Sequence, residues 1–291
     1  MAVTGDATEG MDHLERLPRR LFTLYLPLGV FLFVLLFPFY WMTTTTFKPD
    51  DELYDYARFN PFWVAHPTLA HIEKLFFETS YPSWLINTMI VSVAATAISL
   101  FCSVCAAYAI ERLRFSGARY VGLAIFLAYL VPPSILFIPL AAIIFQLGLF
   151  DSDWALILTY PTFLVPFCTW LLMGFFKAIP RDLEDSAMID GLSRFGAFVK
   201  VVMPISLAGM LTVVIFAFTL VTQEFVYGAT FITSSSSYTV SVGIPTFLVR
   251  GDVYFWGSMM GACLIASVPI AIIYNFFVDR FVAGFTGGAV K

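Results

Sequence analysis

Six long apolar runs restrict this chain to a membrane fold before any motif is considered. They cover Leu21–Met42, Leu85–Ile110, Tyr120–Gln146, Trp154–Phe176, Ile205–Phe231 and Trp256–Val278. Each run reaches the roughly 20 residues that a helix needs to cross a hydrocarbon core of about 30 Å. Only 12% of the 291 residues are charged, against about 25% in an ordinary globular domain. We therefore predict an all-α membrane protein with six transmembrane helices.

The basic residues between these runs predict the orientation of the chain. Lys and Arg follow the second run and the fourth run, whereas the loop Leu147–Asp153 after the third has neither. Cytoplasmic loops carry an excess of Lys and Arg, so both termini are expected in the cytoplasm. The first run lacks the short core and the small-residue cleavage site of a signal peptide, and we interpret it as a retained helix. We divide the chain into a cytoplasmic segment (1–20), a transmembrane domain (21–280) and a cytoplasmic tail (281–291).

Several classes of function have no support in the sequence. A net charge of −4 with scattered basic residues does not resemble a nucleic-acid-binding surface. The three histidines lie outside the apolar runs and form no HExxH pair, and no phosphate-binding G-x-x-x-x-G-K-[ST] loop or G-x-S-x-G elbow occurs. We expect no catalytic residue, metal or cofactor in this chain. The four cysteines fall in apolar runs, where burial as small hydrophobic residues is expected and no disulfide framework is implied: Cys102, Cys105, Cys168 and Cys263.

The segment Pro180–Pro204 is a long polar insertion among the apolar runs of the second half. We predict a helix from Arg181 to Asp190, which Gly191 ends because glycine readily adopts the left-handed conformation. A helix of about ten residues is marginal by itself, so it should dock against something. Its apolar side chains lie on two sides, which suggests a helix held from two directions. A second short helical stretch is expected before Pro204.

Glu224 lies in the outer part of the fifth run, by a count of residues from Pro204. An ionisable group at membrane depth usually faces a cavity or a partner, which makes Glu224 a functional candidate. The alternative is a carboxylate near the outer interface that is hydrogen-bonded for helix packing. Prolines inside the runs leave a similar choice between helices that line a cavity and kinks buried between neighbours.

Four stretches of the sequence resemble one family. Glu184-Asp185-Ser186-Ala187 with Asp190-Gly191 and Val201-Val202-Met203-Pro204 resembles the EAA loop of ATP-binding-cassette importer permeases, E-A-A, three residues, G, nine residues, I-x-L-P. Asp185 and Ser186 replace its first E-A, and Val201 and Met203 replace Ile and Leu. Ala106–Arg112 with Phe115-Ser-Gly117 is similar to the A-Y-A-x-A-R-x-x-F-x-G signature of the maltose-type carbohydrate importers. Gln223-Glu224-Phe225 matches part of W-N-E-F, and the end from Gly284 to Lys291 resembles G-L-T-A-G-A-V-K.

The resemblance implies a permease bundle of six helices in the bacterial inner membrane, with a cytoplasmic coupling helix at Arg181–Asp190. The implied partners are a second homologous permease, an ATPase dimer that holds ATP and Mg²⁺, and an extracytoplasmic solute-binding protein that delivers a carbohydrate. Glu184, Asp185 and Asp190 would offer carboxylates to basic groups of the ATPase. The coupling residues are then Glu184, Asp185, Ser186, Ala187, Asp190, Gly191 and Pro204, and the substrate pathway would include Thr222, Gln223 and Glu224.

Two other classes of function remain as alternatives. An ion-coupled secondary transporter of a small polar solute would need no ATPase, but it should carry ionisable residues in its spans, where Glu224 is the clear candidate. A membrane enzyme would need a nucleophile and a base at matching positions, and no such constellation is visible.

Overall fold

The computed structural model describes residues 20–55, 60–113, 115–251 and 253–289, and almost all of the regular structure in these ranges is helical. The predicted N-terminal segment therefore lies, apart from Arg20, outside the described residues. The chain divides into two compact units, one of residues 1–72 and 256–264 and one of residues 73–255 and 265–291.

The first unit contains η2 (Leu21–Tyr25), α2 (Leu26–Phe47), α3 (Asp50–Tyr54), most of α4 (Ala70–Glu73) and the start of α16 (Trp256–Ala289). Polar contacts hold the segments after α2. The His71 Nε2 atom lies 2.8 Å from the carbonyl oxygen of Lys48, and the Glu52 carboxylate accepts hydrogen bonds from the backbone N–H groups of Ala65 and His66 at 3.2 and 2.9 Å. The buried Glu52 therefore organises this loop from inside the chain.

The second unit contains the remaining elements. In chain order they are η3 (Lys74–Glu78), α5 (Tyr81–Arg112), α6 (Ala118–Tyr129), α7 (Pro133–Gln146), α8 (Asp153–Thr159), α9 (Pro161–Ala178), α10 (Asp182–Ile189), α11 (Arg194–Ala197), η4 (Phe198–Val202), α12 (Met203–Ile205), α13 (Leu207–Thr222), α14 (Val226–Phe231), η5 (Ser235–Ser237), α15 (Val240–Leu248), β1 (Val249–Arg250), β2 (Val253–Tyr254) and the rest of α16. The two strands pair antiparallel as a short hairpin.

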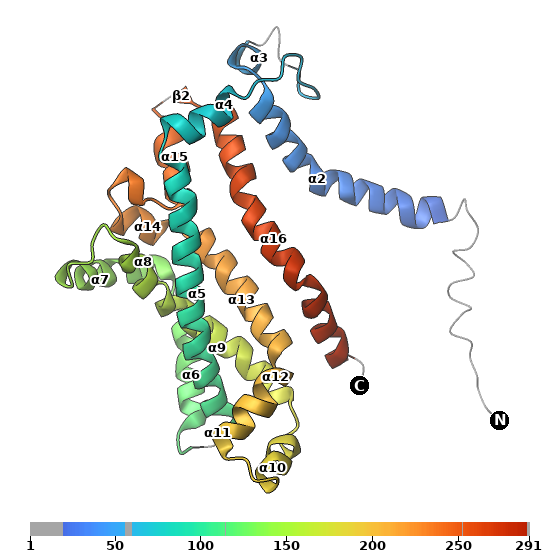
Figure 1. Cartoon of the computed structure of the whole chain (residues 1–291), viewed down its shortest axis with the longest axis vertical. Coiled ribbons are helices and arrows are strands. Elements are labelled where there is room, and N and C mark those ends of the chain that lie inside the picture. Colours follow the sequence, from blue (N-terminus) through green and yellow to red (C-terminus); the bar gives the residue numbers. More distant parts are fainter. Residues whose placement is uncertain (1–19, 56–59, 114, 252, 290–291) are drawn as a thin grey trace. The chain divides into compact units, whose positions relative to one another are not determined.

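The core of the second unit is built around α5, which packs along α9 and α13 (Figure 1). The middle of the buried face of α5 is rich in small side chains, among them Ser92, Ala95, Thr96 and Ser99. Small residues let helix backbones approach closely within a membrane. Opposite them, α9 and α13 supply larger apolar side chains, including Leu164, Leu172 and Val213. Close packing of α5 therefore fixes where its two ends lie in this unit.

Four helical segments among the described residues are long and apolar enough to span a membrane. They are Leu21–Phe47, Tyr81–Arg112, Asp153–Ala178 and Trp256–Phe276. Two further candidates are bent pairs, Ala118–Tyr129 with Pro133–Gln146 at 95° and Arg194–Ile205 with Leu207–Thr222 at 71°. Six spans result when each bent pair counts as one.

The predicted continuous helices Tyr120–Gln146 and Ile205–Phe231 are wrong in detail. The first breaks between α6 and α7, where Pro132 is extended and Pro133 begins the next helix. Proline lacks a backbone N–H group and disfavours the helical conformation in the residue before it, so consecutive prolines end α6. The second stops at Thr222, after which the chain turns before α14. Helix α16 continues to Ala289, so the backbone shows no break at the predicted start of the tail.

The cysteine prediction is partly wrong. Cys168 is buried as expected, but Cys102 and Cys105 are exposed on the surface of α5, and Cys263 is half-buried. All four are free thiols. The apolar run alone did not show which face of α5 packs inside the chain, because the buried face is the one rich in Ser, Thr and Ala.

Candidate coupling site

Helix α10 and its end have the form that the sequence predicts. The helix runs from Asp182 to Ile189, and Gly191 adopts φ +94°. The Gly191 N–H donates to the carbonyl oxygen of Met188 and the Leu192 N–H donates to that of Ala187, both at 3.1 Å. These two bonds form a Schellman motif, which needs a left-handed residue at its centre. The predicted helix and its glycine stop are confirmed.

Glu184 faces the inside of the chain. Its side chain is only 7% exposed. The Tyr108 hydroxyl donates to Glu184 Oε1 at 2.8 Å, and Arg112 Nη1 lies 3.2 Å from Glu184 Oε2. The expectation that Glu184, like Asp185 and Asp190, offers its carboxylate to basic groups of the ATPase does not fit Glu184, because both of its oxygens already have partners on α5.

Arg112 joins three helices at this point. Besides Glu184 of α10, its Nη2 group donates to the carbonyl oxygens of Phe176 and Ile179 at 2.6 and 2.7 Å. These carbonyls lie at the C-terminal end of α9, where backbone acceptors lack partners within the helix. Arg112 itself ends α5 and is 9% exposed. The last turn of α5, the end of α9 and helix α10 are thus connected through one guanidinium group.

A second arginine adds to this connection. Arg181 precedes α10, and its Nη2 group donates to the carbonyl oxygen of Glu111 in the last turn of α5 at 2.7 Å. In the sequence, Arg112 and Arg181 indicate the cytoplasmic side of the membrane. The place of Arg112 in the last turn of α5 was a signal for a structural role, because basic side chains near helix C-termini bond free carbonyl groups. For Arg181, which precedes α10, no such signal was present in the sequence.

The outward face of the segment is apolar in part. Ile189 is 85% exposed and Phe195 is 74% exposed, and Leu183 is also exposed. Ala187 points into the chain, so α10 buries one side and presents the other. The prediction of apolar side chains on two sides of this helix is confirmed. Asp185, Ser186, Asp190 and Gly191 lie on the surface, and Pro204 lies in α12.

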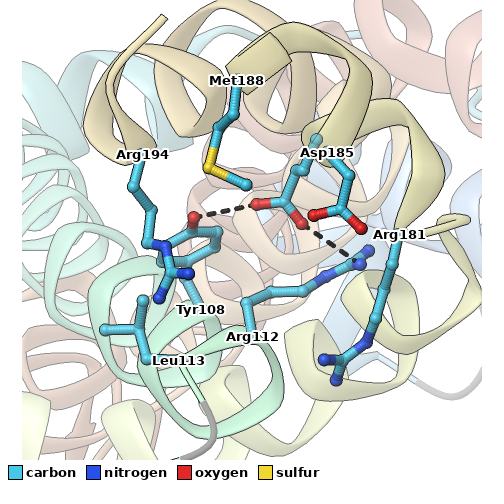
Figure 2. A pocket seen from close by; sticks show the side chains of 8 residues that line it. Tyr108, Arg112, Leu113, Arg181, Asp185, Met188 and Arg194 are labelled. Carbon is cyan, nitrogen blue, oxygen red and sulfur yellow. Dashed lines mark hydrogen bonds and ion pairs between the residues drawn. The ribbon is translucent and has the colours of Figure 1, made fainter.

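A pocket of about 300 Å³ opens between α10, α11 and the end of α5 (Figure 2). Its lining includes Arg112, Arg181 and Arg194, and the carboxylates Glu184 and Asp185. Among the described residues, no group of three His, Cys, Asp or Glu side chains is placed to hold a metal ion. The pocket combines charges of both signs beside an exposed apolar surface, which suits a protein contact better than catalysis.

The predicted pathway residues lie apart from this site, in the turn between α13 and α14. The Glu224 carboxylate accepts hydrogen bonds from the Tyr160 hydroxyl at 2.9 Å and from the N–H groups of Tyr227 and Gly228 at 2.9 and 3.2 Å. The carboxylate therefore accepts from backbone N–H groups in the first turn of α14, which lack partners within the helix. This agrees with the alternative of a carboxylate that is hydrogen-bonded for helix packing. The Thr222 hydroxyl bonds the carbonyl oxygen of Thr219, and Gln223 is exposed.

Three helix breaks meet near Glu224. Tyr160 lies between α8 and α9, Glu224 between α13 and α14, and the Tyr227 hydroxyl donates to the carbonyl oxygen of Pro133 at the start of α7, at 3.1 Å. Tyr160 and Tyr227 are fully buried. Non-helical backbone in a membrane is tolerated where protein or a cavity satisfies it. Here the protein does so, through tyrosine hydroxyls and one carboxylate.

Comparison with known proteins decides the family. The family described as "Binding-protein-dependent transport system inner membrane component" matches residues 99–287. The chain belongs to this family. The match begins within α5 and includes the α5 end, α10 and the junction at Glu224. The chain is thus an inner membrane transport component, and the resemblance to importer permeases found in the sequence is confirmed.

Individual family members match over nearly the whole chain. The inner membrane ABC transporter permease protein YcjP of Escherichia coli (strain K12) is 32% identical over 271 residues, which cover 92% of this chain and 95% of that protein. The sulfoquinovosyl glycerol transport system permease protein SmoH of Agrobacterium fabrum (strain C58 / ATCC 33970) is 37% identical over 259 residues, or 88% and 89% of the two chains.

A solved structure confirms the fold class. A chain of a bacterial ABC transporter involved in the import of the acidic polysaccharide alginate superposes with a TM-score of 0.77 at 16% identity, and the alignment covers 91% of this chain and 98% of that one. The helical importer-permease fold predicted from the apolar runs and the motifs is therefore that of the described chain.

Proposed function

We propose that this chain is the permease subunit of an ATP-driven importer that moves a carbohydrate across the bacterial inner membrane by alternating access. Family membership supports the transport role. The relative SmoH belongs to a sulfoquinovosyl glycerol transport system, which supports a sugar derivative as cargo. The observation that carries the coupling role is α10, a short helix joined to α5 directly and to α9 through Arg112, with Ile189 of α10 and Phe195 of the following α11 exposed.

The proposed partners are a second homologous permease, an ATPase dimer that binds ATP and Mg²⁺, and an extracytoplasmic solute-binding protein. Helix α10 would dock on the ATPase in the cytoplasm, and both termini would lie on the same side by the distribution of Lys and Arg. Exposed apolar side chains next to charged ones are typical of the core and rim of a protein interface. Asp185 and Asp190 stay available for basic groups of the ATPase, whereas Glu184 holds α10 in place.

The contacts of α10 suggest how motion is passed on. When the ATPase dimer closes, a pull on α10 acts through Glu184 on Arg112 and Tyr108, and through Arg112 on the end of α9. Helices α5 and α9 would then move together with α10, and rocking of the bundle would open the cargo site to the other side. The pathway is proposed to pass the junction of α13 and α14, with Gln223 and Thr222 as polar contacts and Glu224 as the residue that shapes the turn.

The experiment uses the complete complex in proteoliposomes, with loaded solute-binding protein and a panel of radiolabelled sugars. ATP without an ion gradient is expected to drive uptake. Uptake under an ion gradient without ATP would instead identify a secondary transporter and overturn the proposal.

Gly191→Val tests the coupling role of α10 in the same assay. A β-branched residue at φ +94° adds about 1–2 kcal/mol of strain. This strain lowers the equilibrium constant for the correctly turned segment by roughly 5-fold to 30-fold, and uptake and transport-coupled ATP hydrolysis should fall by up to that factor.

The chain offers a matched control for Gly191→Val. Gly148 has φ +68° and ends α7 with the same two bonds, from its own N–H to Phe145 and from the Leu149 N–H to Ile144, both 3.1 Å. Gly148→Val imposes similar strain away from α10. Equal loss of uptake in both variants would show that turn strain, and not coupling through α10, is responsible.

A further inference from the structure

A second pocket lies on the other side of Arg181, between the end of α5 and the start of α6. It has a volume of about 740 Å³. Its apolar lining includes Ile110 and Met173, and α6 approaches these side chains closely at Gly122. Its charged lining consists of Glu111, Arg119 and Arg181. The pocket therefore combines apolar and charged side chains where the span Tyr81–Arg112 ends.

The two arginines of this pocket differ in their attachment. The guanidinium of Arg181 is fixed by its bond to the carbonyl oxygen of Glu111 at 2.7 Å. Arg119 is exposed, and no hydrogen bond or ion pair connects it to another described residue. With the carboxylate of Glu111, the pocket carries a net charge of +1. Guanidinium groups bind phosphate oxygens with charge-assisted hydrogen bonds, so the pocket suits a singly charged phosphodiester.

An apolar surface continues from the pocket along α6. Tyr120, Leu123 and Leu127 are 77%, 53% and 54% exposed. Their spacing of three and four residues places them on one face of the helix. Leu123 also lines the pocket. A molecule with an anionic end in the pocket can thus extend a hydrocarbon chain along this face.

We propose that this pocket binds an anionic glycerophospholipid of the phosphatidylglycerol class. The phosphodiester lies between Arg119 and Arg181, the headgroup hydroxyls donate to the Glu111 carboxylate, and an acyl chain follows Leu123 and Leu127 on α6. Basic pockets at the ends of membrane helices are typical sites for anionic headgroups. The single negative charge of this headgroup neutralises the pocket, whereas a zwitterionic lipid leaves its charge in place.

The test measures lipid binding to the purified complex, delipidated in detergent and titrated with phosphatidylglycerol under native mass spectrometry. Arg119→Gln is expected to weaken binding by about tenfold or more, as loss of a hydrogen bond to a charged group implies. Arg119 takes no part in the coupling contacts, so the variant should assemble normally. Phosphatidylethanolamine and phosphatidylcholine are expected to bind at least several-fold more weakly than phosphatidylglycerol.

Lys177→Gln is the matched control. Lys177 is an exposed base in the last turn of α9, near the same end of the bundle, and it does not line the pocket. Equal weakening in the two variants would show diffuse surface attraction and overturn the site. Equal binding of the zwitterionic lipids, or full displacement by millimolar inorganic phosphate, would overturn the assignment to an anionic lipid. Because binding is read directly, the result does not depend on the proposed transport activity.

Discussion

Glu184 lies in the short helix α10 and Glu224 just before the short helix α14, but their partners differ in charge. Glu184 faces the Arg112 guanidinium and the Tyr108 hydroxyl. Glu224 is held by neutral donors, namely the Tyr160 hydroxyl and two backbone N–H groups at the start of α14. A charge pair connects separate helices and leaves a buried charge when it is broken. Neutral donors instead hold the turn before α14 against Tyr160, and a substitution there weakens these bonds without leaving an opposite charge buried.

The largest effect is expected for Arg112→Gln. The change leaves Glu184 buried without its cation and removes the donors to the carbonyl groups of Phe176 and Ile179. Removal of one member of a buried charge pair costs about 3–5 kcal/mol. The apparent melting temperature of the purified complex should fall sharply, and uptake per ATP hydrolysed should fall with it.

A double variant tests whether charge pairing causes that loss. In Arg112→Gln with Glu184→Gln, no charge is left buried, so the double variant should be more stable than the sum of the two single changes predicts. Strictly additive losses would contradict a pair between the two side chains. Tyr108→Phe, which removes one neutral donor, should cost less than Arg112→Gln.

Glu224→Gln should have an intermediate effect. The amide keeps one acceptor oxygen but places an NH₂ group against the N–H group of either Tyr227 or Gly228, at a cost of about 1–3 kcal/mol. Thermal unfolding of the complex measures this loss. The adjacent exposed residue supplies the control, since Gln223→Ala should stay within about 0.5 kcal/mol of the parent. A larger loss of stability in Gln223→Ala than in Glu224→Gln would contradict the structural role given to Glu224.

Asp151 is a third acid, on the surface, and loss of its charge should have the smallest effect on stability. The Ser234 side chain and N–H, with the Thr233 N–H, donate to its carboxylate and lower its pKa. A lowered pKa in the folded chain gives stability that is present above the unfolded carboxyl pKa of about 3.9 and is lost as the pH falls through the folded value. Solvent limits this contribution to under about 1 kcal/mol.

The pH dependence of Asp151 is measured against Asp151→Asn. At pH 6 the parent should melt at a slightly higher temperature than the variant, and this difference should shrink as the pH is lowered below 4. If the difference in melting temperature grew as the pH was lowered, the Ser234 and Thr233 donors would not be stabilising the charged form of Asp151. Asp190→Asn, at an exposed acid of the coupling segment, is the control.

Local features of this fold were predictable from the sequence, and contacts between distant residues were not. The apolar runs indicated the membrane class, and Gly191 indicated the end of α10, because both depend on neighbouring residues. The contacts of Arg112 with Phe176 and Ile179 join residues more than 60 positions apart and leave no periodic pattern.

The helix break before α7 was missed for a different reason. The mean hydropathy of the run Tyr120–Gln146 stays high across the bend, and Pro132 and Pro133 were the available signal. At Glu224 the sequence left a choice between a cavity and a packing role. Only the structure places Tyr160 and the start of α14 around it, and both lie outside the pattern of apolar residues.

The exposed side chains of Ile189 and Phe195 also affect the subunit before it assembles. Apolar surface that is meant for a partner favours self-association while the partner is missing. A cell that makes this chain without its ATPase would therefore be expected to lose it to aggregation or proteolysis. Because Ile189 and Phe195 are proposed to dock on the ATPase, their exposure also means that the cell must make the subunits in balanced amounts.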